Sequence, residues 1–145
     1  MKLDKIYNEV VKEVLKSNHR VTMGCIEDDT IGITTNGFMM YFIPKNEFLL
    51  DTDALIKNRV NNVRLDLFKE PEDLKEVVKT NVYCKQDKNT LVKIGDKYVN
   101  EKYLKNFEKY ASFKTTDKFN TPLYVYEYDV LVGLVMPVRV NDEAN

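Results

Sequence analysis

Apolar side chains recur every three or four residues at the start of the chain, as they do on one face of an amphipathic helix. Leu3, Ile6, Val10 and Val14 form the centre of this face, and charged residues lie between them. This spacing predicts a helix that ends near residues 17–18.

Three short apolar or alternating runs follow the first helix, at residues 20–27, 30–36 and 38–44. An Asp-Asp pair and an Asn-Gly pair separate them, and such pairs form tight turns. The pattern predicts an antiparallel meander of three strands. Pro44 is expected to end the third strand, because proline has no backbone N–H to donate.

The middle of the chain has a weaker pattern. Alternating Val63, Leu65 and Leu67 favour a strand with one polar face, and residues 71–79 favour a short helix because Pro71 is followed by two acidic residues. A hairpin is predicted next, with its turn between residues 87 and 89.

A second amphipathic pattern covers residues 100–111 and predicts another helix, with Asn100 as its N-cap. A tight turn is expected at Tyr128–Asp129, between the last two strands. The strand-like runs after this helix are residues 112–117, 122–128 and 130–140.

The order of these elements is the same in two parts of the chain. From residue 8 and again from residue 100, a predicted helix precedes predicted strands. Each of the two parts ends in an apolar run with one proline, Pro44 in the first and Pro137 in the second. An internal duplication would leave such a pattern. Two unrelated helix-and-strand units would also fit it.

The length of 145 residues suits one domain, and four prolines and five glycines are too few for a flexible linker. We therefore expect an α+β fold in a single domain over residues 1–140, followed by a polar tail at residues 141–145.

The composition excludes several classes of protein. A formal charge of −1 argues against a protein that coats nucleic acid indiscriminately. Charges throughout the first 18 residues argue against a signal peptide or a membrane span, so a cytoplasmic protein without membrane contact is expected.

Catalytic and metal-binding signals are weak. Cys25 and Cys84 lie far apart, and His19 is the single histidine, so neither a zinc site nor a Cys-His pair is indicated. We expect buried, reduced cysteines. The glycines are isolated, and the acidic residues 27–29 suit a turn. The sequence predicts no cofactor, no metal and no enzyme activity.

The last third of the chain, residues 94–140, resembles the C-terminal part of the bacterial DNA polymerase sliding clamp, the beta subunit. In that family a strand leads into an N-x-x-Y-L helix start, and the chain closes on a strand with a Met-Pro-x-Arg motif. The matching residues here are Asn100, Tyr103, Leu104, Met136, Pro137, Val138 and Arg139. The resemblance implies a DNA-clamp-like domain of two pseudo-symmetric halves, with both helices packed on one face of antiparallel sheet.

Clamps hold double-stranded DNA inside a ring lined with helices, through attraction between basic side chains and phosphates. The resemblance therefore implies DNA-facing lysines on the outer sides of the two helices, with Glu9 and Glu13 diluting the first group. A solvated helix face would also be rich in lysine. The candidate DNA-facing residues are Lys5, Lys12, Lys16, Lys102, Lys105 and Lys109.

The clamp family also binds apolar peptides of replication and repair proteins against its closing strand. By position, this implies a peptide-binding role for Leu134, Met136 and Pro137. The alternative is that Leu134 and Met136 belong to the core.

Two functions follow as hypotheses. The first is a non-catalytic, sliding-clamp-like protein that binds in DNA replication or repair, or a phage or mobile-element relative of one. Such a ring needs several copies, since known rings hold six domains, and so implies a homo-oligomer. The second is a monomeric or dimeric protein-interaction module or regulator that keeps the clamp fold without encircling DNA.

Overall fold

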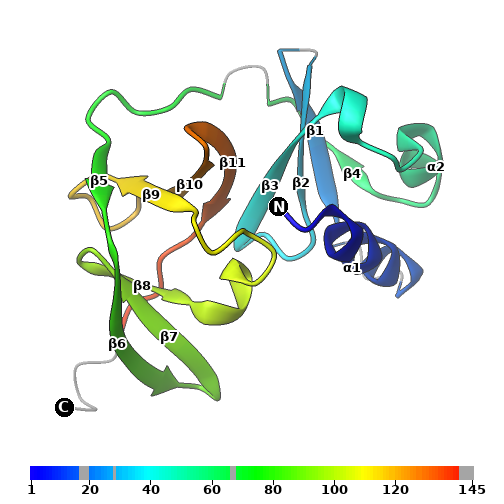
Figure 1. Ribbon diagram of the computed structural model, residues 1–145. Coiled ribbons are helices and arrows are strands. Elements are labelled where there is room, and N and C mark those ends of the chain that lie inside the picture. Colours follow the sequence, from blue (N-terminus) through cyan, green and yellow to red (C-terminus); the bar gives the residue numbers. More distant parts are fainter. Residues whose placement is uncertain (17–19, 28, 66–67, 141–145) are drawn as a thin grey trace. The chain divides into compact units, whose positions relative to one another are not determined.

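The computed structural model describes residues 1–16, 20–27, 29–65 and 68–140 (Figure 1). Its contacts divide the chain into two compact units, Met1–Glu70 and Pro71–Asn145, which we describe separately. The single domain over residues 1–140 stays a prediction, and the expected tail at 141–145 lies outside the described residues.

The first unit contains a helix and the predicted meander. Helix α1 covers Leu3–Leu15, and strands β1 (Thr22–Ile26), β2 (Thr30–Thr34) and β3 (Met39–Pro44) pair antiparallel in sequence order. The helix and all three strands are confirmed, including the end of β3 at Pro44. A two-residue strand, β4 (Asn61–Asn62), runs parallel to β1 at the edge.

Helix α1 covers one face of this sheet (Figure 1). Its Ile6 and Val10 are fully buried, as the amphipathic pattern requires. Successive residues of a strand point to opposite faces, so the buried Met23, Ile33 and Tyr41 share one face of the register. The hydroxyl of Tyr41 lies 3.5 Å from the Glu9 carboxylate, which identifies this face as the helix side.

A second helix, α2 (Thr52–Lys57), follows a 3-10 turn at Lys45–Glu47. Asp51 is its N-cap, and the carboxylate accepts hydrogen bonds from the backbone N–H groups of Asp53 and Ala54. Sequence reasoning missed this helix, although an aspartate before a short apolar run is a recognisable N-cap signal.

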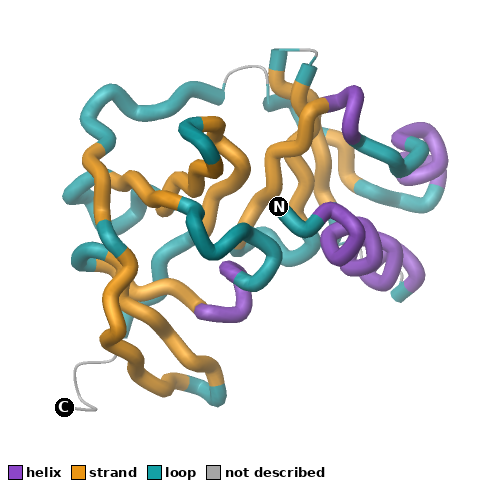
Figure 2. The backbone as a smooth tube through the Cα atoms, viewed as in Figure 1, coloured by secondary structure: helices purple, strands orange, loops and turns teal. Residues whose placement is uncertain are grey.

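The second unit is built mainly of strands (Figure 2). One group has the spatial order β11-β10-β9-β5, and a three-stranded sheet has the order β6-β7-β8. The hairpin turn predicted at residues 87–89 and the turn at Tyr128–Asp129 are both confirmed. The strands are β5 (Lys75–Val77), β6 (Lys79–Gln86), β7 (Asn89–Ile94), β8 (Lys97–Asn100), β9 (Ser112–Thr115), β10 (Leu123–Glu127) and β11 (Val130–Val135).

Two corners join these two groups of strands. At the first, β5 leads directly into β6 (Figure 1), and the backbone N–H of Gly95 donates to the carbonyl of Val78. A Cβ atom at Gly95 would lie 2.7 Å from Val77, so only glycine fits this corner. At the second, the chain leaves β11 and the Val138 N–H donates to the carbonyl of Tyr98 in β8. The two corners thus join the two groups of strands within the second unit.

A buried lysine connects the same two groups of strands. Lys97 of β8 is 6% exposed, and its ammonium donates to the Thr115 hydroxyl at 2.7 Å and to the carbonyls of Lys118 and Thr121 at 2.7 and 2.8 Å. Three acceptors satisfy all three donors of an ammonium group. Burial lowers the pKa of Lys97 from its usual value, and the charge of Asp117 opposes this shift.

The helix predicted over residues 100–111 is wrong. Asn100 does cap a helical turn, since its side chain accepts from the Lys102 N–H, but the turn is a 3-10 helix of four residues, Glu101–Leu104. The Glu127 carboxylate takes the N–H of Glu108, which an α-helix would direct to Leu104. A tertiary hydrogen bond thus replaces a backbone hydrogen bond that the α-helix would need.

Two predictions for the middle of the chain are also wrong. Residues 71–79 form no helix, because Lys75–Val77 pairs with β9 as strand β5, and an isolated helix of nine residues is marginal. Residues 63–65 of the alternating run do not form the predicted strand. Strand β4 ends at Asn62, and residues 66–67 lie outside the described residues.

The α+β class is confirmed, with strands predominating and two α-helices among the described residues. The strand order of the predicted repeat occurs twice, as β1-β2-β3 and β9-β10-β11. The α-helix of the predicted repeat occurs only before β1-β2-β3. The arrangement of two predicted helices on one face is wrong because residues 100–111 contain only a 3-10 turn of four residues, Glu101–Leu104. In the described part of the chain, no helix is long and apolar enough to cross a membrane.

Replacing Lys97 by methionine is expected to destabilise the protein. The substitution keeps the approximate length of the side chain but removes the ammonium donor from the carbonyls of Lys118 and Thr121, which keep only the longer hydrogen bonds from the Thr121 N–H and the Thr115 hydroxyl. We expect the free energy of unfolding to fall by about 2–4 kcal/mol. Urea denaturation measures this loss, and Lys85→Met on exposed strand β6 is the matched control. A loss equal to that of the control would contradict the role of Lys97.

Candidate binding surfaces

Three of the predicted DNA-facing lysines lie in one exposed stripe on α1. Lys5, Lys12 and Lys16 are separated by seven and four residues, which places them on the same side of the helix, and all three are exposed. Lys16 forms an ion pair with Glu13 at 3.0 Å. The pair is at the surface, so it contributes little and is screened by salt. The stripe is available to an anionic partner.

The expected dilution of this stripe by Glu9 is wrong. Glu9 points toward the sheet, where its carboxylate accepts a hydrogen bond of 2.8 Å from the hydroxyl of buried Thr35. Tyr41 approaches the other oxygen of the same carboxylate. A hydroxyl partner satisfies this half-buried acid, so it serves the packing of α1.

The other three predicted lysines lie in the second unit, and no helix carries them as a group. Lys102 belongs to the 3-10 turn, and Lys105 and Lys109 follow in turns. All three are exposed, and the ammonium of Lys102 lies 5.3 Å from the centroid of the Tyr103 ring. They lack the regular spacing that a helix gives to the stripe on α1.

The closing motif has a structural role within the second unit. Leu134 lies near the end of β11 and is half-buried, and Pro137 follows the strand and is also half-buried. After Pro137, Val138 pairs with β8, and the guanidinium of Arg139 lies 4.1 Å from the centroid of the Phe119 ring. Of the three predicted peptide-binding residues, Met136 is the most accessible, at 37% exposed.

Sequence reasoning missed an aromatic pair at the surface of the second unit. Tyr128 is 81% exposed at the tip of the β10–β11 hairpin, and its ring centroid lies 4.6 Å from that of Tyr110. Tyr128 and Asp129 have φ angles of 52° and 62°, as a type I′ turn requires. Val130 follows Asp129 on the other side of the turn and is also exposed. We call Tyr110, Tyr128 and Val130 the tyrosine patch.

Two acidic residues act on the tyrosine patch. Burial, the hydrogen bond with Tyr128 and the charges of Glu127 and Glu108 together raise the pKa of Tyr110 to about 12. The Glu127 carboxylate accepts a hydrogen bond of 2.8 Å from the Glu108 N–H. This bond attaches the loop that contains Tyr110 to strand β10, which contains Glu127. The patch therefore combines exposed aromatic rings with the nearby charges of Glu108 and Glu127.

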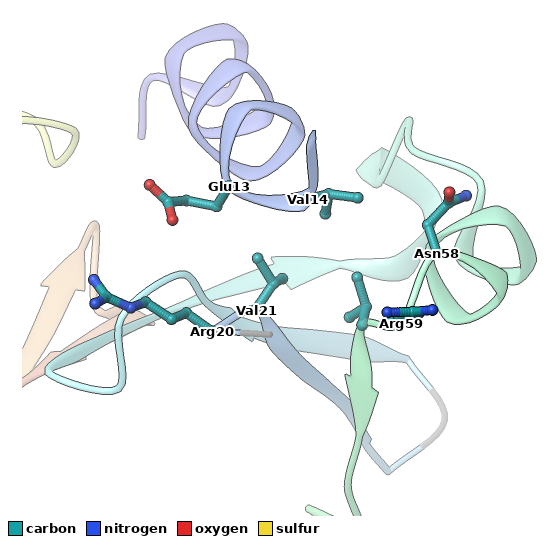
Figure 3. Close-up of a pocket in the computed structure, with 7 residues that line it drawn as sticks. Glu13, Val14, Arg20, Val21, Asn58 and Arg59 are labelled. Carbon is teal, nitrogen blue, oxygen red and sulfur yellow. The ribbon is translucent and has the colours of Figure 1, made fainter. Parts of the chain in front are cut away.

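A small, partly open hollow lies in the first unit (Figure 3). Val14 and Val21 lie between its two polar ends, where Arg20 is on the Glu13 side and Arg59 is beside Asn58 (Figure 3). The two guanidinium groups do not converge on a common point. The hollow thus lacks the paired cations that a phosphate or carboxylate site needs.

The expectation of buried cysteines is wrong, since Cys25 is exposed and Cys84 is half-buried, and both are free thiols. His19 lies outside the described residues. Among the described residues, no three His, Cys, Asp or Glu side chains lie together in a group that could hold a metal ion.

Comparison with known proteins gives no match to a family model, a curated protein or a solved structure. The similarity to the sliding clamp stays a hypothesis from the sequence. The function has to be argued from the surfaces themselves.

The substitution Tyr128→Phe is expected to lower the pKa of Tyr110 from about 12, because it removes the hydrogen bond that stabilises the protonated phenol. A raised folded-state pKa contributes stability that is complete below the unfolded value near 10 and is lost as the pH rises through about 12. Tyrosinate absorbance, followed in an alkaline titration with Tyr110→Phe to assign the transition, measures the shift. An unchanged titration would contradict the coupling of the two hydroxyls.

Proposed function

We propose that the chain is a non-catalytic protein-interaction module that binds a basic segment of a partner protein at the tyrosine patch. The exposed pair Tyr110–Tyr128, whose rings contact each other at an interplanar angle of 35°, is the observation that carries this proposal. Exposed aromatic residues cost free energy in water and dominate the binding energy of many protein interfaces. This function corresponds to the second hypothesis from the sequence, a module that does not encircle DNA.

Charge specifies the partner. Glu108 and Glu127 are the acidic residues that act on Tyr110, and their charges favour a cation above the rings. This unit already places cations over aromatic rings, since the Lys114 ammonium lies 4.8 Å from the centroid of the Tyr126 ring. An arginine suits the patch best, because its planar guanidinium stacks on a ring while it donates to a carboxylate.

Binding to the tyrosine patch can be tested with a short capped peptide that alternates arginine and serine. We expect the ring resonances of Tyr110 and Tyr128 to shift on titration, and Tyr128→Ala to weaken binding about three- to tenfold. Nuclear magnetic resonance spectroscopy measures both effects.

Two controls belong to this experiment. Tyr83→Ala removes another exposed tyrosine, from β6, and should leave binding unchanged, and a peptide with glutamate in place of arginine should not bind. Equal losses in Tyr83→Ala and Tyr128→Ala would refute the site.

A second function is supported by the lysine stripe of α1. We propose that Lys5, Lys12 and Lys16 contact the phosphate backbone of double-stranded DNA without reading its sequence. The inward position of Glu9 favours this contact, because it removes a negative charge from the side of the helix that the stripe occupies.

Replacing Lys5, Lys12 and Lys16 together by glutamine is expected to reduce DNA affinity and to flatten its salt dependence. The slope of log affinity against log salt should fall by about 2–3, as expected for three lost phosphate contacts. Fluorescence anisotropy with a labelled duplex measures this slope. The control changes three exposed lysines of the second unit, Lys79, Lys85 and Lys88. If both triple variants reduce the slope equally, the stripe is not a specific contact surface.

A further inference from the structure

Strand β6 forms one edge of the three-stranded sheet β6-β7-β8 (Figure 1), and β7 is its neighbour on the other side. An edge strand presents a row of backbone N–H and C=O groups that the sheet itself does not pair. The strand is eight residues long, and most of its side chains are exposed or half-buried. This edge is therefore a candidate site for pairing with a further strand.

The turn at the end of β6 determines which backbone groups point outward. Both turn residues, Asp87 and Lys88, have positive φ angles, 51° and 67°, as in a type I′ turn. The residues on either side of such a turn form a hydrogen-bonded pair, and hydrogen-bonded and non-hydrogen-bonded pairs then alternate along the ladder. Counting back from the turn, the N–H and C=O groups of Cys84 point toward β7, whereas those of Tyr83 and Lys85 point away from it.

The outward groups of Tyr83 and Lys85 have no hydrogen-bond partner among the described residues. Before Tyr83 the register with β7 shifts, and the N–H of Val82 donates to the Thr80 hydroxyl at 3.1 Å. A further strand can therefore pair with β6 from Tyr83 to the turn, but not along the irregular part before it.

The register also indicates which side chain fits beside Tyr83. Tyr83, Val92 and Val99 lie opposite one another on the three strands and so share one face of the sheet. Val92 and Val99 are fully buried, whereas Tyr83 is exposed at the end of this row. An apolar side chain on an added strand would continue the row and cover the Tyr83 ring.

Charge indicates the rest of the partner. The β6–β7 hairpin carries three exposed lysines, Lys79, Lys85 and Lys88, and one acidic residue, Asp87. Lysine on an edge discourages pairing with uncharged or basic strands, while acidic side chains opposite lysine stabilise a pair of strands. The edge is thus complementary to an acidic segment.

We propose that β6 binds an extended acidic segment of a partner protein as an added strand, at a site that we call the β6 edge and define by Tyr83 and Lys85. The segment carries a carboxylate opposite Lys85 and, two residues away on the same face, an apolar side chain opposite Tyr83. Backbone hydrogen bonds supply affinity, and the two side chains supply specificity. The site differs from the tyrosine patch in position and in the charge that it selects, so it goes beyond the function proposed above.

Hydrogen exchange of single amides tests the β6 edge directly. In the protein alone, the outward amides of Tyr83 and Lys85 should exchange quickly and the amide of Cys84 slowly. The probe is the capped peptide Thr-Glu-Thr-Val-Thr-Glu-Thr, in which glutamates lie two residues from a central valine. At saturation it should slow exchange at Tyr83 and Lys85 by at least about tenfold, because both amides become hydrogen-bonded. Nuclear magnetic resonance spectroscopy measures all three amides.

Two outcomes of this experiment would overturn the proposal. If the Tyr83 and Lys85 amides are already protected without peptide, another part of the chain covers the edge, or a second copy does where the protection rises with protein concentration. If the peptide binds without protecting these amides, it does not add a strand to β6.

N-methyl groups moved along the peptide test the backbone pairing. Successive N–H groups of a strand point to opposite sides, so methylation should weaken binding about three- to tenfold at every second central position. The positions between them are matched controls, because their N–H groups point away from β6. Equal losses at consecutive positions would contradict strand addition.

A charge exchange tests the role of Lys85. Lys85→Glu should weaken binding of the acidic peptide about three- to fivefold and should favour a peptide with lysine in place of glutamate. Lys109→Glu changes an exposed lysine of the same unit outside this sheet and should leave both affinities unchanged. If the two variants have equal effects, only net charge matters and the assignment to β6 is refuted.

Discussion

The hydrogen bonds of the buried Lys97 ammonium group are the interaction on which the second unit depends. A buried charge is tolerated only when its hydrogen bonds are complete, and here the acceptors come from β9 and from the loop before β10. The loop has to adopt one conformation to present two carbonyls to the same ammonium. The Thr115 hydroxyl, which donates toward the carbonyl of Pro122 at 3.1 Å, extends the network to the start of β10. A polar network of this kind specifies one packing of two strand groups where apolar contacts alone would allow several.

The first unit depends on a constraint of the opposite kind, the lack of side chains at Gly24 and Gly32. Its sheet has α1 on one face, so the other face has to be covered by a segment without secondary structure of its own. The glycines let that segment approach the backbone closely, and Leu65 supplies the apolar contact. Helix packing by large residues and segment packing over small ones thus cover the two faces of one sheet.

Local patterns in the sequence identified α1, the meander and both hairpin turns, because in each case the signal and its structural cause lie within a few residues. The helix at residues 100–111 failed for the opposite reason. Its apolar spacing is helical, but Phe107 is buried and the Glu108 N–H is taken by Glu127, nineteen residues away. The tyrosine patch could not be predicted from the sequence either, because Tyr110 and Tyr128 come into contact only after the hairpin has formed. The lysine stripe could be predicted because helical spacing alone determines it.

The residues that carry the resemblance to the clamp family are mostly those that build the second unit. Asn100 caps a turn, Val138 pairs with Tyr98, and Arg139 stacks on Phe119. Side chains committed to such contacts can be retained for the fold whatever the protein binds, so their pattern indicates an architecture before it indicates a partner. Side chains that project from the same strands carry more functional information, because their exposure is not explained by packing. By this criterion the tyrosine patch ranks above Leu134 and Pro137, whose partial burial fits their place in the closing segment.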